Sequence, residues 1–195
     1  MPLLANQVKF LAQTVSKPRL VGAVSPSSRA LSKTLVEWID WNRAEAVVEY
    51  GPGTGVVTDI VLSLKRPQTH YFAIEINEAF VKILGERYPH VPVYCESAVN
   101  IQSICERAGV SQLDAVICGL PWAAFSEEDQ DDLLDAMMDV LPPGGQFVTF
   151  AYWTGLMLPA GQRFRNKLRK YFGQVAESKT VWRNLPPAFV YRCRR

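Results

Sequence analysis

The feature that most limits the fold of this chain is a glycine-rich turn at residues 51–55. It reads Gly-Pro-Gly-Thr-Gly, follows the apolar run 46–50 and leads into a helical pattern over 55–64. Glycines at such a strand-to-helix turn adopt backbone angles that other residues avoid, and they let the backbone approach a ligand closely. The turn is typical of a nucleotide-binding βα unit in an open α/β sheet.

The chain after this turn alternates short apolar runs with helical patterns, which predicts βα units and a parallel sheet. The expected strands have β-branched or aromatic centres and span residues 46–50, 70–75, 91–95, 113–119 and 145–151. The helices expected between them lie near 55–64, 77–87, 99–108 and 126–140. We therefore expect a Rossmann-like α/β core.

The C-terminal part has a different pattern. A basic helix is expected over 162–172, and two β-rich runs follow at 174–182 and 188–192. The connection 183–187 is too short for a crossover helix, so the two runs should form an antiparallel hairpin. The length fits a single domain over residues 1–195, with an N-terminal helical extension (1–44) before the core (45–195).

Two acidic side chains frame the glycine turn. Glu75 ends the second expected strand, 24 residues after Gly51, a spacing that suits a carboxylate holding the two ribose hydroxyls of a nucleoside. Glu49 precedes the turn, where a carboxylate would repel a pyrophosphate but suits the cationic methionyl end of S-adenosylmethionine. Dinucleotide-binding proteins use G-x-G-x-x-G, whereas this turn is G-x-G-x-G and position 56 is Val. The pattern therefore favours S-adenosylmethionine as the cofactor and a class I methyltransferase sheet.

Further cofactor contacts are expected where the third and fourth strands end. Ser97 stands where many such enzymes have an aspartate that binds the adenine amino group. The predicted cofactor-binding residues are Glu49, Gly51, Pro52, Gly53, Thr54, Gly55, Glu75, Ile76, Ser97, Ala98 and Gly119. The four cysteines are scattered without a C-x-x-C pair, which predicts no metal site and suits a reducing cytoplasm.

The segment Gly119-Leu120-Pro121-Trp122 raises the question of the methyl acceptor. It resembles the Asn-Leu-Pro-Tyr signature of ribosomal RNA adenine dimethyltransferases, in which the Asn side chain engages the adenine amino group. Gly119 has no side chain for that contact, and residues 160–195 leave no room for an RNA-binding domain. A nucleic-acid partner is therefore disfavoured. An rRNA adenine N6-methyltransferase stays as one alternative, and a non-catalytic methyltransferase-like membrane-binding module as another.

Several segments together resemble the bacterial phospholipid N-methyltransferases, which act on phosphatidylethanolamine or ornithine lipids. The resemblance rests on residues 17–19, 22–29, 49–55, 119–121 and 184–188. Its more specific parts are Pro26-Ser27-Ser28 and Asn184-Leu185-Pro186-Pro187-Ala188. It implies N-methylation of a lipid amine by a cytoplasmic enzyme on the inner face of the cell membrane.

The charge distribution agrees with an anionic membrane partner. Residues 160–195 carry ten basic and one acidic residue, whereas residues 46–159 carry five basic and fifteen acidic residues. An N-terminal stripe of Leu4, Val8, Leu11 and Val15 predicts an amphipathic helix for membrane docking. Packing of that helix on the core, as a lid over the cofactor, is the alternative.

The acceptor side is assigned by the same reasoning. The predicted catalytic residues are Gly119, Leu120, Pro121 and Tyr152: backbone carbonyls of the first two orient the amine, and Tyr152 binds it or relays a proton. The predicted substrate-binding residues are Ser27, Ser28, Trp122, Tyr152 and Arg183. Arg183 is expected to bind a lipid phosphate or carboxylate. One of the two serines is alternatively only the N-cap of a helix.

Overall fold

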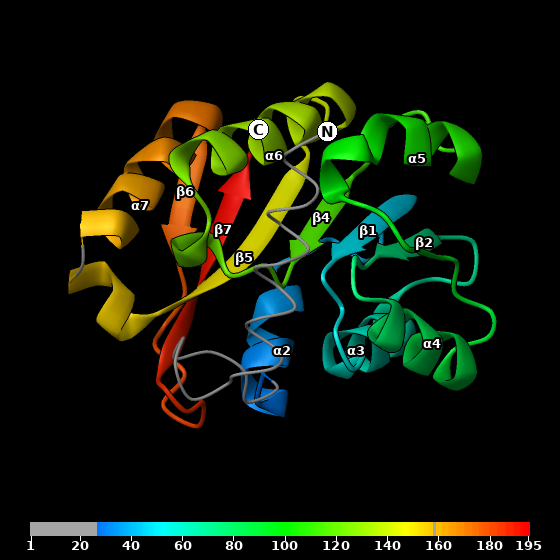
Figure 1. The fold of residues 1–195 in the computed structure, drawn as a ribbon, viewed down its shortest axis with the longest axis horizontal. Helices are drawn as coiled ribbons and strands as arrows, with labels where there is room; N and C mark the ends of the chain where they lie inside the picture. Colours follow the sequence, from blue (N-terminus) through cyan, green and yellow to red (C-terminus); the bar gives the residue numbers. More distant parts are fainter. Residues whose placement is uncertain (1–26, 158) are drawn as a thin grey trace.

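The computed structural model describes residues 27–157 and 159–195. Their centre is a seven-stranded sheet of order β3-β2-β1-β4-β5-β7-β6 (Figure 1). The strands are β1 (Ala46–Tyr50), β2 (His70–Ile74), β3 (Val93–Tyr94), β4 (Ala115–Cys118), β5 (Gln146–Tyr152), β6 (Gln174–Glu177) and β7 (Ala188–Arg194). Strands β1 to β5 are parallel, and β7 runs antiparallel to both β5 and β6. The predicted Rossmann-like methyltransferase sheet with its C-terminal hairpin is confirmed.

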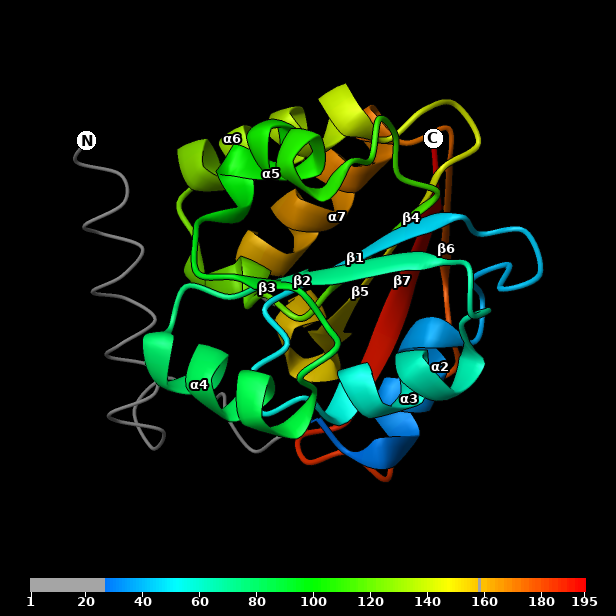
Figure 2. The ribbon, with the colours of Figure 1, turned by 90° about the vertical axis from the view of Figure 1, so that its right-hand side faces the viewer.

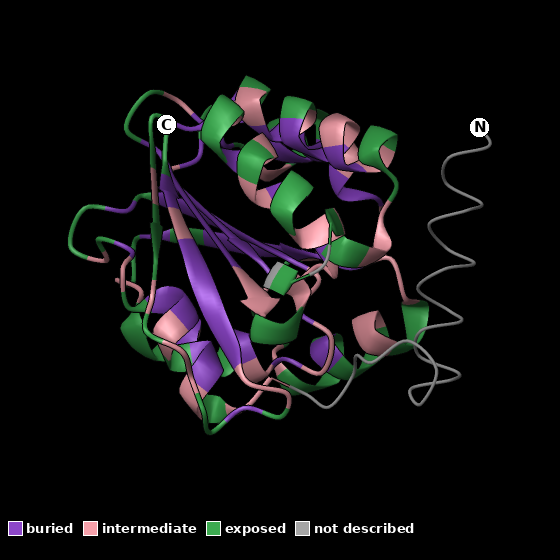
Figure 3. Ribbon diagram, turned by 90° about the vertical axis from the view of Figure 1, so that its left-hand side faces the viewer, coloured by how far each residue is buried: buried purple, intermediate pink, exposed green. Residues whose placement is uncertain are grey.

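Helices cover both faces of the sheet. The elements are α2 (Arg29–Val36), α3 (Val56–Leu64), α4 (Glu78–Arg87), α5 (Ile101–Ala108), α6 (Glu127–Val140) and α7 (Pro159–Tyr171), with short 3-10 helices η1 (Ala98–Asn100), η2 (Trp122–Ala124) and η3 (Trp153–Met157). Figure 2 shows α2, α3 and α4 on one face and α5, α6 and α7 on the other. Because both faces are covered, all five residues of β1 are buried. Figure 3 shows buried residues, in purple, along the strands at the centre of the molecule.

Alternation along the strands sends side chains to two separate cores. Val48, Val116 and Phe147 are aligned across β1, β4 and β5 and pack beneath α5, α6 and α7. Val47 belongs to the other core, with α2 and α3. Since Glu49 lies two residues after Val47, it also points toward α3. A carboxylate is thereby placed under the glycine turn.

The N-terminal helix stripe at residues 4–15 lies outside the described residues. The described end of the predicted extension, from residue 27, packs as part of the core: Leu31, Leu35 and Val36 are buried against the α3 side. Helix α2 starts where the sequence predicts, because the Ser28 hydroxyl oxygen accepts a hydrogen bond from Leu31 N at 3.2 Å. The division into 1–44 and 45–195 stays a prediction.

The predicted basic helix is α7, and part of its charge faces the acidic helix α6. Lys167 lies 2.7 Å from Asp131, and Arg163 lies 2.9 Å from Glu127. Ion pairs of this kind each add little to stability, but they neutralise part of the C-terminal basic excess.

Strand β3 is shorter than predicted, spanning two residues instead of 91–95. Pro92 lacks an N–H for the ladder and only its carbonyl bonds to Ala73 N, at 2.9 Å.

Candidate active site

The glycine turn has a backbone that only glycine adopts easily. Gly51, Gly53 and Gly55 have φ values of 67°, 56° and 85°. A Cβ on Gly55 would lie 2.6 Å from the Tyr88 ring, and one on Gly51 would lie 2.8 Å from Leu120 Cδ2. At Gly53 a Cβ would meet nothing within 4 Å, so only the backbone angle requires glycine there. The turn is thus packed from behind and open at Gly53.

Glu75 holds the open part of the turn. Its carboxylate accepts hydrogen bonds from Gly53 N at 3.1 Å and from Asn77 N at 3.0 Å. The residue is 7% exposed, and burial raises the pKa of its carboxyl, an effect that the backbone N–H bonds partly offset. The sequence-predicted partner of the turn therefore lies directly beside it. Ile76 follows Glu75 at the same strand end and is half-buried.

Glu49 lies deeper, 2% exposed beneath the turn. Its carboxylate accepts hydrogen bonds from the Thr58 hydroxyl, at 2.8 Å, and from the Tyr71 hydroxyl. Burial raises the pKa of Glu49 to about 7, although the two hydroxyl bonds pull it down. Below that pH the carboxyl is largely neutral, and above it the site holds a negative charge.

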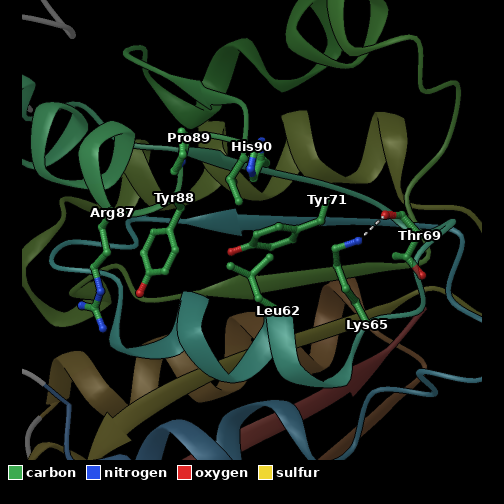
Figure 4. A pocket seen from close by; sticks show the side chains of 9 residues that line it. Leu62, Lys65, Thr69, Tyr71, Arg87, Tyr88, Pro89 and His90 are labelled. Atoms are coloured by element: carbon green, nitrogen blue, oxygen red, sulfur yellow. Dashed lines mark hydrogen bonds between the residues drawn. The ribbon is translucent and has the colours of Figure 1, made fainter.

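Sequence reasoning missed Thr58 and Tyr71. Each carried a signal: Thr58 is a polar residue on the buried face of α3, and Tyr71 lies diagonally across from Glu49, since Val47 pairs with Tyr71 in the parallel register. The Tyr71 ring also lines a cavity of about 390 Å³ together with Leu62, Lys65 and Tyr88 (Figure 4). The Tyr88 hydroxyl donates to Gly55 O at 2.9 Å, so this cavity lies behind the turn.

Gly119, at the end of β4, packs tightly against the turn. Its N–H donates to Tyr50 O at 2.8 Å, and a Cβ on Gly119 would lie 2.7 Å from Gly51 O. The backbones at Gly51 and Gly119 therefore lie too close together for a side chain at position 119. This explains a glycine where the RNA adenine dimethyltransferases have asparagine. Leu120 packs against Gly51, and its carbonyl accepts from Trp122 N at 3.0 Å. That carbonyl keeps one lone pair for an acceptor amine.

Trp122, which the sequence predicts to bind the substrate, is buried and hydrogen-bonded in the structure. It is 4% exposed, its indole N–H donates to Thr149 Oγ1 at 3.0 Å, and its ring stacks on Phe164 with centroids 4.8 Å apart. Gln130 Nε2 also donates to Trp122 O at 2.8 Å. These contacts anchor Trp122 in the core next to Leu120 and Pro121, and its part in substrate binding stays a prediction.

Ser97 and Ala98 follow β3, and both are buried. The Ser97 hydroxyl oxygen accepts from Val99 N at 3.4 Å as the N-cap of η1. Ala98 belongs to the core beneath α5 and α6. The loop after β3 thus reaches the carboxyl edge of the sheet, where ligands of open α/β sheets bind.

The two segments that carried the more specific resemblance contact each other. Asn184 Oδ1 accepts from Ser28 N at 2.9 Å, and Asn184 Nδ2 donates to Pro186 O at 2.7 Å. Asn184 is only 5% exposed, so it holds this loop from the inside. Sequence reasoning noted Asn184 within its motif and did not select it as a site residue. Ser28 serves as the N-cap, in agreement with the alternative reading of the serines.

Tyr152 lies beside this loop. It pairs with Ala188 in the β5–β7 register, and the next residue, Trp153, donates its N–H to Pro187 O at 2.9 Å. Tyr152 is half-buried, and burial raises the pKa of its hydroxyl. Arg183 is exposed in the same loop. The predicted site residues therefore form two groups at the carboxyl edge of the parallel strands, one at β1, β2 and β4 and one at β5 and β7.

The first group fits S-adenosylmethionine. It offers an open glycine backbone at Gly53 and a buried carboxylate at Glu75 for the ribose hydroxyls. A second carboxylate, Glu49, can carry the negative charge that attracts the cationic methionyl end of the cofactor. A Cβ at Gly51 would meet the Leu120 side chain and one at Gly119 would meet Gly51 O, so neither position has room for a side chain. A pyrophosphate at this turn would instead lie close to the buried Glu49 carboxylate, which would repel it when ionised.

Comparison with known proteins agrees with this fit. A family model described as a methyltransferase domain matches residues 47–145. The ornithine lipid N-methyltransferase of Singulisphaera acidiphila is 33% identical over 95% of this chain and 94% of its own length.

Solved structures show the same fold. An O-methyltransferase of tomaymycin synthesis from Streptomyces achromogenes, in complex with S-adenosylmethionine, has a TM-score of 0.65 at 16% identity, covering 96% of this chain and 89% of its own. An O-methyltransferase from Bacillus cereus, in complex with S-adenosylhomocysteine, has a TM-score of 0.66 at 13% identity with the same coverage. The chain therefore belongs to the S-adenosylmethionine-dependent methyltransferases, in the family that also holds the ornithine lipid N-methyltransferase.

Proposed function

We propose that this enzyme methylates the amine headgroup of a membrane lipid, either an ornithine lipid or phosphatidylethanolamine. The observation that carries the proposal is the 33% identity to an ornithine lipid N-methyltransferase over nearly the whole of both chains. The contact between Ser28 and Asn184 supports it, because it joins two segments outside the cofactor turn on which the resemblance to the phospholipid N-methyltransferases rests.

The cofactor supplies a methyl group on a sulfonium, which is already activated for displacement by a nucleophile. The protein then has to position the partners and exclude water. We assign the glycine turn and Glu75 to the nucleoside, Glu49 to the cationic end, directly or through water, and Ser97 and Ala98 to the adenine side. The Gly119 and Leu120 carbonyls orient the amine, with Pro121 fixing their direction.

The acceptor amine must lose a proton before it can attack. Tyr152 is the titratable group at the β5 end of the site, and its hydroxyl accepts a hydrogen bond from the amine or passes its proton outward. Its burial disfavours the phenolate, so we assign it to orientation and relay rather than to acting as a strong base. Arg183 takes the lipid phosphate or carboxylate at the exposed side of the same loop.

The RNA adenine alternative is not favoured. A side chain at position 119 would meet Gly51 O within 2.7 Å at its Cβ, so the asparagine of that signature does not fit this backbone. The alternative of a non-catalytic module predicts cofactor binding without turnover on any lipid.

We also propose docking on the anionic inner face of the membrane. In the described parts of the chain, none of the helices combines the length and the apolar character needed to cross a bilayer. Basic residues near an anionic surface contribute about 1 kcal/mol each. The C-terminal basic residues without an ion pair in the described structure, such as Lys179 and Arg183, are the ones available for this.

The proposal is tested by expressing the chain in a host whose aminolipids are unmethylated and analysing the lipid extract by mass spectrometry. We expect new species that carry one, two or three added methyl groups, and none when Glu75→Ala is expressed to the same level. Methylated ribosomal RNA with unchanged lipids would refute the proposal in favour of the RNA alternative.

A further inference from the structure

Most of the large apolar side chains exposed on the described structure gather in two short segments. Trp153 and Met157 of η3 are 47% and 72% exposed, and Trp182 and Leu185 of the β6–β7 connection are 73% and 84% exposed. We call these four residues the apolar rim. The other exposed large hydrophobics are Leu64 and Ile83, at 43% and 42%, on α3 and α4. Grouped exposure of this kind marks an interaction surface, unlike scattered single residues.

Backbone contacts hold the two segments of the rim side by side. Trp153 N donates to Pro187 O at 2.9 Å, Tyr152 pairs with Ala188, and Val181 forms a bridge with Ala188. In Figure 1, η3 and the β6–β7 connection lie at the left and lower-left end of the molecule, where β5 ends and β7 begins. The two segments of the rim are therefore neighbours in space although they are far apart in the sequence.

The rim is held from beneath by buried polar contacts. Asn184 lies between Trp182 and Leu185 in the chain, is 5% exposed, and bonds to Ser28 N and Pro186 O. Its own N–H donates to Val181 O at 3.2 Å. The connection is thus anchored to the start of α2 while its apolar side chains point to solvent, so their exposure is a fixed property of the loop.

Cationic side chains accompany the rim. Arg183 is exposed between Trp182 and Asn184, Lys179 is exposed earlier in the connection, and Arg29 is exposed next to Ser28. The acidic residue of this region, Glu177, is paired with Arg165 at 2.9 Å. Tryptophan, leucine and methionine flanked by cations that have no ion pair within residues 27–157 and 159–195 match the interface of an anionic bilayer, where indole rings sit at headgroup level and cations meet the lipid phosphates.

The rim also adjoins the acceptor side of the site. Tyr152 directly precedes Trp153 and lies opposite Ala188, which ends the connection. We propose that the apolar rim inserts into the headgroup region of an anionic membrane and brings lipid amines to the Tyr152 end of the active site. This inference rests on the proposed lipid acceptor and names the surface through which that acceptor is reached.

The test compares the double variant Trp182→Ala/Leu185→Ala with the full-length wild type. Sedimentation with vesicles of phosphatidylglycerol and phosphatidylethanolamine should show partitioning weakened by about tenfold or more, since two large apolar side chains leave the bilayer. The matched control Leu64→Ala/Ile83→Ala removes exposed apolar surface from another face and should partition like wild type. Equal partitioning of the wild type and the rim variant would overturn the proposal.

A second measurement follows insertion directly. Vesicles with brominated acyl chains should quench wild-type tryptophan fluorescence, and Trp182→Phe should lose a distinct part of that quenching while binding S-adenosylmethionine normally. Unchanged quenching would overturn the insertion. A change in the solution mass of the rim variant without lipid would also overturn it, because the rim would then be a contact between copies of this chain.

Failure of the rim and failure of the proposed function are distinguishable. On a short-chain phosphatidylethanolamine or ornithine lipid dispersed as monomers, the rim variant should methylate at the wild-type rate, whereas on vesicles its rate should fall with its partitioning. An equal loss of rate on the monomeric lipid would refute a docking role. A wild type that binds vesicles through the rim but methylates neither lipid would leave the surface standing and refute the proposed function.

Discussion

The two sides of the active site are built in different ways. The cofactor side, at β1 and β2, is local in the sequence: Glu49, the glycine turn, Thr58, Tyr71 and Glu75 lie within 27 residues and bond to one another. The acceptor side, at β5 and β7, joins Ser28, Tyr152 and Asn184 from three distant parts of the chain. The cofactor side is buried and polar, and the acceptor side opens onto exposed apolar residues. We therefore expect that binding of the cofactor and binding of the acceptor can be disturbed separately.

The largest expected effect is on the cofactor side. Glu75→Ala removes the acceptor for Gly53 N and the carboxylate assigned to the ribose, so we expect S-adenosylmethionine affinity to fall by about 100-fold or more, from the loss of two or more charge-assisted hydrogen bonds. Calorimetry measures the dissociation constant. Glu78→Ala, which removes an exposed carboxylate at the start of α4, is the control and should bind as wild type does. Wild-type affinity in Glu75→Ala would contradict the cofactor assignment.

The acceptor side should respond with the opposite pattern. Asn184→Ala leaves Ser28 N and Pro186 O without their partner, so the free energy of unfolding should fall by about 1–3 kcal/mol. Turnover on lipid vesicles should fall as well, while the S-adenosylmethionine dissociation constant stays unchanged. Urea denaturation and calorimetry measure the two quantities.

A pH-dependent comparison is available at the same position. Asn184→Asp keeps an oxygen that accepts from Ser28 N but puts a second oxygen where Asn184 Nδ2 donates to Pro186 O, so at neutral pH it should lose at least as much stability as Asn184→Ala. The loss should shrink at low pH, where the protonated carboxyl can donate to Pro186 O. Asn166→Ala, at an exposed position on α7, should change neither quantity. If Asn184→Ala weakened the cofactor as much as the lipid turnover, the separation of the two sides would be wrong.

A smaller effect is expected from pH. The pKa of Glu49 is raised to about 7 in the folded protein, so its negative charge forms only as the pH rises through that value. If Glu49 faces the cationic end of S-adenosylmethionine, affinity should rise by up to about tenfold between about pH 6 and pH 8. Glu49→Gln should give a flat profile, and a wild-type profile that falls over this range would contradict the assignment.

The free energy of unfolding of the unliganded protein should fall as the pH rises, whereas the cofactor affinity should rise. A carboxyl with a folded-state pKa above its usual 4.5 binds its proton more tightly when folded. Its contribution to stability is therefore fully present below about pH 4.5 and is lost as the pH rises through about 7.

Tyr71→Phe removes a hydrogen bond that lowers the pKa of Glu49, so the rise in cofactor affinity should shift to higher pH.

The smallest expected effect concerns the basic helix. Lys167→Met breaks the ion pair with Asp131, and because such pairs contribute about 0–1 kcal/mol, the free energy of unfolding should change by less than about 1 kcal/mol. Vesicle binding should also change little, since Lys167 is already paired. A loss of vesicle binding as large as that of Arg183→Gln would show that α7 itself faces the membrane.

Particular residues show what the sequence could predict. Strand β1, the glycine turn and Glu75 were predictable because spacing along one βα unit fixes their arrangement. The hairpin of β6 and β7 was predictable because its connection is short. The burial of Trp122 was not predictable, because it depends on Thr149 and Phe164, which only the folded sheet and α7 bring to it. The bond between Ser28 and Asn184 spans 156 residues, and no local pattern encodes such a pairing.

Methyl transfer by the purified full-length protein tests the central claim most directly. Vesicles containing ornithine lipid or phosphatidylethanolamine are incubated with S-adenosylmethionine whose methyl group carries deuterium, and the lipids are analysed by mass spectrometry. We predict deuterated methyl groups on the headgroup amine of at least one of the two lipids, none with Glu75→Ala, and a reduced yield with Asn184→Ala. Tight cofactor binding without label on either lipid would contradict the account.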